Sequence, residues 1–157
     1  MDWLSDPQAW IAFVTLVTLE LVLGVAITAA CLTAYGLGLA MHPEPAGVFN
    51  TTAATMAFVT LSFSELFRAF TARSERYPLL RIGIFSNRNM TYAVMASAVL
   101  LLAVIYVPFM NEIFDTIPLD WSHWQYVLPL LFVPSLVAEI TKAIVTRQLS
   151  RRALQPA

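Results

Sequence analysis

The sequence predicts an all-α fold: a polytopic membrane protein built as a four-helix transmembrane bundle. Of its 157 residues, 59% are hydrophobic and 12% are charged, whereas soluble domains are about half apolar and about one quarter charged. The hydrophobic residues also gather in long runs, and about 20 apolar residues cross the roughly 30 Å core of a bilayer. A chain of this length therefore holds about four crossings in a single membrane domain, residues 1–157, without a sizeable soluble catalytic domain.

Four apolar runs define the expected helices. They lie at about residues 10–40, 53–70, 90–107 and 124–145. The first run spans about 46 Å at 1.5 Å per residue, which is longer than one crossing needs, so we expect its ends to tilt or to lie in the interface. Small residues in this run permit another helix to approach closely around Gly24, Ala26, Ala29 and Ala30.

The connections between the runs differ in charge. Residues 41–52 hold helix-breaking prolines and a glycine, which predict a short turn. Residues 71–89 are rich in arginine, and the connection at 109–123 is acidic. Because cytoplasmic loops are enriched in Lys and Arg, we expect the 71–89 connection, the tail at 146–157 and both termini in the cytoplasm. The short connections fit a plasma membrane at least as well as an internal one.

The composition also excludes several functions. Nine Lys and Arg residues against ten Asp and Glu residues leave no strongly basic patch for nucleic acid. The chain has no Gly-rich phosphate loop, nucleophile elbow or helical His-Glu metal motif, so it offers no catalytic residue. His42 and His123 fall on different connections with no further Cys or His at ligand spacing, which argues against a metal site there.

Three carboxylates lie inside the apolar runs, where ionisable groups are costly and mark functional sites by default. Glu139 has Lys142 three residues later, which predicts an interfacial ion pair on one helix face. Glu20 has no charged neighbour one turn away along its own helix. We therefore expect Glu20 to be either protonated or partnered by another helix.

Glu65 has two interpretations. Arg68 follows it by three residues, so the two side chains can form a self-neutralised pair. Alternatively, Glu65 is a cation ligand, because hard cations prefer carboxylate, carbonyl and hydroxyl oxygens and Ser62 places a hydroxyl one turn away on the same face. Glu65 is thus the main candidate cation ligand, with Ser62 and Glu20 as secondary candidates.

Several motifs occur in a recognisable order. They are Glu65-Leu66-Phe67-Arg68, Gly83-Ile84-Phe85-Ser86-Asn87, Val104-Ile105-Tyr106-Val107-Pro108 and Glu139-Ile140-Thr141-Lys142. Together they resemble the last four membrane helices of a type II P-type cation-transporting ATPase, the group that contains the calcium pumps of the sarcoplasmic reticulum and the secretory pathway. The resemblance covers about residues 55–147 well, and the first helix only by position and character.

The resemblance implies a role for Glu65, which matches a glutamate that contributes to one calcium site in sarcoplasmic-reticulum-type pumps. Two departures from the family bear on this role. Arg68 stands where the family often has asparagine, and secretory-pathway pumps lack this second calcium site. The chain also lacks the Asp-Lys-Thr-Gly phosphorylation motif, the nucleotide and actuator domains and the six earlier helices, so it cannot hydrolyse ATP alone by that mechanism.

We therefore expect a C-terminal membrane-support domain of a P-type cation pump. Its partners would be the lipid bilayer and the remaining transmembrane helices of the pump. The chain itself implies no cofactor, and calcium or another cation belongs to the complete pump. The alternatives are a free-standing four-helix membrane scaffold or regulatory subunit, a non-functional remnant, and a small homo-oligomeric channel lined by Glu65.

Overall fold

The computed structural model describes residues 7–45, 47–71 and 87–153. These residues form helices without a single strand, which confirms the all-α prediction. The helices are α1 (Pro7–Met41), α2 (Thr51–Thr71), α4 (Arg88–Tyr106), α5 (Pro108–Phe114) and α6 (Trp121–Ala153).

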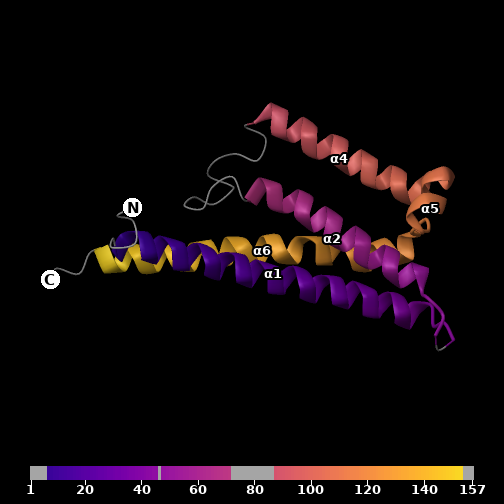
Figure 1. The fold of residues 1–157 in the computed structure, drawn as a ribbon, viewed down its shortest axis with the longest axis horizontal. Coiled ribbons are helices and arrows are strands. Elements are labelled where there is room, and N and C mark those ends of the chain that lie inside the picture. Colours follow the sequence, from indigo (N-terminus) through magenta and orange to yellow (C-terminus); the bar gives the residue numbers. More distant parts are fainter. Residues whose placement is uncertain (1–6, 46, 72–86, 154–157) are drawn as a thin grey trace.

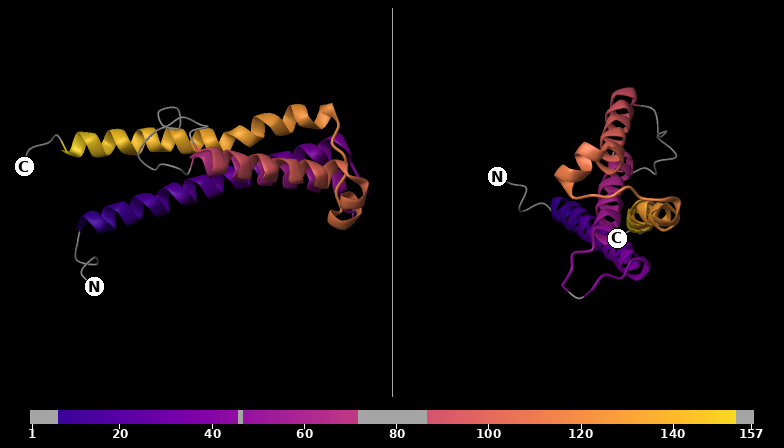
Figure 2. Two further views of the ribbon diagram at one scale, coloured as in Figure 1. Left: turned by 90° about the horizontal axis from the view of Figure 1, so that it is seen from above. Right: turned by 90° about the vertical axis from the view of Figure 1, so that its right-hand side faces the viewer.

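The three helices α1, α2 and α6 pack against one another, and α4 lies along α2 (Figures 1 and 2). Helix α1 begins and α6 ends at the same end of the bundle. The opposite end, which we call the far end, is formed by residues 42–45, 47–50 and 107–120. The main buried cluster joins all four long helices and consists of Ala34, Met56, Val59, Ile105, Leu119, Val127 and Leu131.

Three of the described helices are long and apolar enough to cross a membrane: α1 over Ala9–Met41, α4 over Arg88–Tyr106 and α6 over Trp121–Thr141. This confirms the membrane class. Helix α2 has 21 residues, enough for a crossing, but it is not among these three. Its polar Thr55, Thr60 and Ser64 are buried. A helix enclosed by neighbours can carry polar residues that a lipid-facing helix cannot, so the polar face of α2 follows from its central place.

Helices α1 and α2 touch backbone to backbone at Gly38. A Cβ atom built on Gly38 would lie 2.5 Å from the Cα atom of Ala53, so glycine is required at this position. Around Gly24, where small residues permit a close approach, Ala30 is buried, but a Cβ atom on Gly24 would meet nothing within 4 Å. The backbone contact between α1 and α2 lies about four turns further along α1.

Helix α4 ends where Pro108 begins α5. Proline has no N–H group, so it leaves the carbonyl four residues earlier, that of Val104, without its helical partner. The hydroxyl of Thr116 donates to this carbonyl oxygen at 2.7 Å. The side-chain amide of Asn111 donates to the next carbonyl, that of Ile105, at 3.0 Å. Side chains that follow the end of α4 therefore supply the hydrogen bonds that its last carbonyl groups lack.

The helix bounds differ from the sequence prediction in two places. The acidic connection at 109–123 contains α5 and the start of α6. Helix α6 continues to Ala153, so most of the tail at 146–157 is helical, and Pro129 and Pro134 lie inside this helix without ending it. In the arginine-rich connection, residues 72–86 lie outside the described residues.

Candidate functional site

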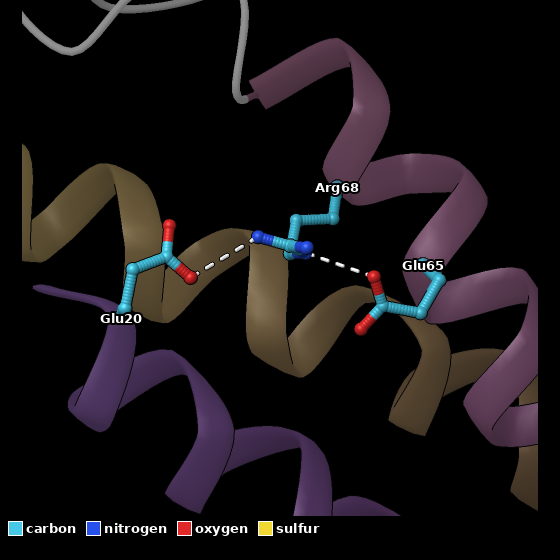
Figure 3. A network of polar contacts seen from close by, with 3 residues as sticks. All are labelled: Glu20, Glu65 and Arg68. Carbon is cyan, nitrogen blue, oxygen red and sulfur yellow. Dashed lines mark hydrogen bonds and ion pairs between the residues drawn. The ribbon is translucent and has the colours of Figure 1, made fainter.

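The guanidinium of Arg68 lies between two carboxylates from different helices (Figure 3). Its Nε atom donates to Oε2 of Glu65 at 2.9 Å, on the same face of α2. Its Nη1 atom donates to Oε2 of Glu20 on α1 at 3.2 Å. We call these three residues the Arg68 network. It ties α1 to α2 across their interface.

The Arg68 network shows which partners these carboxylates have among the described residues. The self-neutralised pair of Glu65 and Arg68 is present, since their atoms are in direct contact. Glu20 is partnered by another helix of the same chain, as one of its two interpretations predicted. One cation between two carboxylates leaves a formal charge of −1 when both carboxylates are ionised.

The network lies at the edge of the bundle. The side chain of Arg68 is 33% exposed, that of Glu65 44% and that of Glu20 62%. Each carboxylate therefore keeps part of its surface open after contacting Arg68. Because charged groups inside a membrane face a bundle interior or a water-filled cavity, this open side is suited to contact with further polar protein groups.

The other predicted site residues lie apart from this network. Ser62 is half-buried, and among the described residues it makes no hydrogen bond to Glu65. Glu139 is half-buried on α6, while the side chain of its expected partner Lys142 lies outside the described side chains.

Sequence reasoning missed Ser64, which is fully buried beside Glu65. Its Oγ atom has no hydrogen-bond partner among the described residues. The signal that could have found it is the spacing of four residues between Thr60 and Ser64, which places two polar groups on one inward face of α2.

The two histidines, which the sequence places on different connections, lie in contact in the structure. His42 Nε2 lies 2.9 Å from His123 Nε2, although the two residues are 81 positions apart in the sequence. Helices α1 and α6 both reach the far end of the bundle, which brings the two connections together (Figure 1). Spacing along the sequence could not show this contact.

The comparisons with known proteins define the class. Residues 7–144 match the family described as the C-terminus of cation transporting ATPases. Since this match covers most of the chain, the chain belongs to that family. It is an integral membrane protein with the character of the C-terminal membrane part of a cation-transporting ATPase.

Relatives in this family are named as calcium-transporting ATPases. Calcium-transporting ATPase 1 of Bacillus cereus is 37% identical over 90 residues, which is 57% of this chain and 10% of that protein. Calcium-transporting ATPase type 2C member 1 of Homo sapiens is 36% identical over the same share of both chains. The endoplasmic reticulum calcium ATPase srcA of Aspergillus fumigatus is 30% identical over 93 residues, or 59% of this chain and 10% of that protein. The matched part thus spans about one tenth of each relative.

Proposed function

We propose that this chain is the C-terminal membrane-support part of a P-type calcium-transporting ATPase, and that it packs against the transport helices of the rest of the pump. The observation that carries the proposal is the family match over residues 7–144, together with the names of the calcium-transporting relatives. The proposed setting is the plasma membrane, which the short connections fit, and the basic residues near 71–89 and the C-terminus favour both termini in the cytoplasm.

The Arg68 network indicates where the partner helices would pack. Its open carboxylate surfaces lie on the side shared by α1 and α2, where lipid would leave charged groups poorly solvated. A transport helix that presents hydrogen-bond donors to Glu20 and Glu65 would cover this side. The partner surface of the chain in the proposed pump is therefore the α1–α2 edge that carries the network.

Glu65 is the proposed ligand of a transported cation, with Ser62 and Glu20 as secondary candidates. One oxygen of Glu65 accepts a hydrogen bond from Arg68, and calcium requires six to eight oxygens in total. The remaining ligands would come from the partner helices. Glu20 gives the guanidinium a second carboxylate, so Arg68 keeps a counter-charge when Glu65 turns towards a cation.

The deciding experiment is to sequence the DNA immediately upstream of the codon for residue 1 in the source genome. The proposal expects a reading frame, joined to this chain or separate, that encodes an Asp-Lys-Thr-Gly motif and six hydrophobic spans. If no such frame exists anywhere in the genome, transport lacks an energy source. The scaffold, regulatory-subunit or remnant alternative would then replace the pump.

A variant of Glu20 tests the same proposal on the purified protein. If the chain is the free-standing bundle of the alternative, the contact between Glu20 and Arg68 stabilises it, and Glu20→Leu destabilises the isolated chain. In the pump, Glu20→Leu should also weaken co-purification of the chain with the transport helices. Glu44→Leu is the matched control, because it removes a carboxylate at the far end, away from the network. Unchanged co-purification of both variants would contradict a partner surface at the network.

A further inference from the structure

A pair of histidine rings joins two long helices at the far end of the bundle. His42 follows α1 directly, and His123 lies in the first turn of α6. Their Nε2 atoms are 2.9 Å apart, and their ring centroids are 5.1 Å apart. A nitrogen–nitrogen distance of this length is a hydrogen bond, in which one ring donates and the other accepts.

A backbone N–H group just before α6 determines which ring donates. The N–H group of Asp120 donates to Nδ1 of His123 at 3.1 Å, so this nitrogen carries no proton. A neutral imidazole then holds its proton on the other nitrogen. His123 therefore donates from Nε2 to Nε2 of His42, and the proton of the His42 ring is on Nδ1.

The same contact argues against a metal ion between the two rings. A histidine that binds metal through Nε2 carries its proton on Nδ1 and donates it to an acceptor. Here Nδ1 of His123 faces an N–H donor. Structural zinc sites also use about four protein ligands, and the described residues contain no group of three or more His, Cys, Asp or Glu that could hold a metal.

The pair is connected to the start of α2 as well. Asn50 precedes α2, and its side-chain amide donates to the backbone carbonyl of His42. The side-chain oxygen of Asn50 accepts from the N–H of Ala53 at 2.8 Å. Asn50 and His123 are both buried. The hydrogen bonds around the two rings thus join the end of α1 to the beginnings of α2 and α6.

We propose that His42 and His123 form a proton-sensitive latch at the far end of the bundle. If His42 takes a proton on Nε2, two N–H groups face each other across 2.9 Å. If His123 takes one on Nδ1, that N–H faces the N–H of Asp120. One added proton therefore removes one of the two hydrogen bonds, and with both rings charged the bond between the rings is lost in every arrangement. Because acidification adds protons to histidine, we expect the latch to be closed at high pH and open at low pH.

The charged surroundings of the latch are of one sign. The other charged residues of the far end are carboxylates, at Glu44, Glu112, Asp115 and Asp120. The nearby hydroxyl of Tyr106 donates to the carbonyl of Leu119. Among the described residues, neither ring forms an ion pair. Protonation of His42 Nε2 disturbs the bond between the rings, and protonation of His123 Nδ1 disturbs the bond from Asp120.

Thermal unfolding of the full chain in detergent between about pH 8 and pH 5 tests the latch. The melting temperature of the wild-type chain should fall by several degrees on acidification. His42→Gln keeps an acceptor for the Nε2–H of His123 but cannot be protonated, so it should match the wild type at the high pH and lose less at the low pH. His42→Gln with His123→Gln should remove the histidine-dependent fall. Glu44→Gln is the control and should keep the wild-type profile.

Nitrogen NMR of the labelled imidazole rings provides a second measurement that does not depend on stability. At the high pH, His123 should carry its proton on Nε2 and His42 on Nδ1, and both signatures should be lost on acidification. The opposite tautomers would overturn the proposal, as would an unchanged pH profile in the double variant. A melting temperature raised by zinc in the wild type but not in the double variant would replace the latch with a metal site.

Discussion

Gly38 on α1 and Ala53 on α2 approach backbone to backbone, since a Cβ atom on Gly38 would lie 2.5 Å from the Cα atom of Ala53. The obstructing atom belongs to the backbone and cannot rotate away. Gly38→Ala must therefore push α1 and α2 apart. We expect this variant to lower the free energy of unfolding by about 1–3 kcal/mol, which is typical of overpacking. Denaturant titration of the full chain in detergent measures the change.

Gly36 is the matched control for that variant. It lies on the same helix, and a Cβ atom there would meet nothing within 4 Å. Alanine favours helix over glycine by up to about 1 kcal/mol, so Gly36→Ala should be neutral or slightly stabilising. Equal losses in both variants would mean that the contact with Ala53 does not set the helix spacing.

Thr116→Val should destabilise the turn after α4. The hydroxyl of Thr116 is the donor to the Val104 carbonyl, and Thr116 is buried. Valine keeps the shape but leaves that carbonyl unsatisfied, which costs about 1–3 kcal/mol. Thr28→Val is the control, because the exposed hydroxyl of Thr28 donates only to Gly24 of its own helix. The prediction fails if Thr28→Val is as destabilising as Thr116→Val in the same titration.

The two ion pairs of Arg68 should differ in strength. The pair with Glu65 is shorter and less exposed than the pair with Glu20. Double-mutant cycles with Arg68→Gln, Glu65→Gln and Glu20→Gln should therefore give the larger coupling for Glu65. A larger coupling to Glu20 would show instead that the contact between helices dominates the network.

The isolated chain should bind calcium only weakly. Glu65 and one neighbouring hydroxyl fall well short of the six to eight oxygens that calcium takes, and Arg68 holds one oxygen of Glu65. Equilibrium dialysis of the full chain in detergent measures the affinity. Arg68→Asn removes the competing positive charge, so it should bind calcium more tightly than the wild type. Stoichiometric micromolar binding by the wild-type chain would contradict the prediction.

The parts of this structure that depend on local pattern could be predicted from the sequence. The apolar runs indicated the four long helices, and the spacing of three residues between Glu65 and Arg68 indicated their ion pair. Both follow from the helical repeat alone. The identity of the residues was sufficient because the contacts are made within one helix.

Contacts between helices were not available from pattern alone. The partner of the Glu20 carboxylate could lie on any neighbouring helix, and only the antiparallel packing of α1 and α2 shows that it is Arg68. Likewise, the small residues around Gly24 permit a close approach, yet the backbone contact between α1 and α2 is at Gly38. Register between helices is set by the whole packed surface, and a single sequence does not give it.

The hydrogen bond between Thr116 and Val104 has a consequence for the order in which the protein is made. Val104 leaves the ribosome 12 residues before Thr116. A nascent chain that has emerged only as far as Pro108 therefore has α4 with an unsatisfied carbonyl near its end. That end is completed only when the segment leading into α6 has been synthesised. The last turn of α4 thus becomes fully hydrogen-bonded only after Thr116 has been synthesised, five residues before α6 begins.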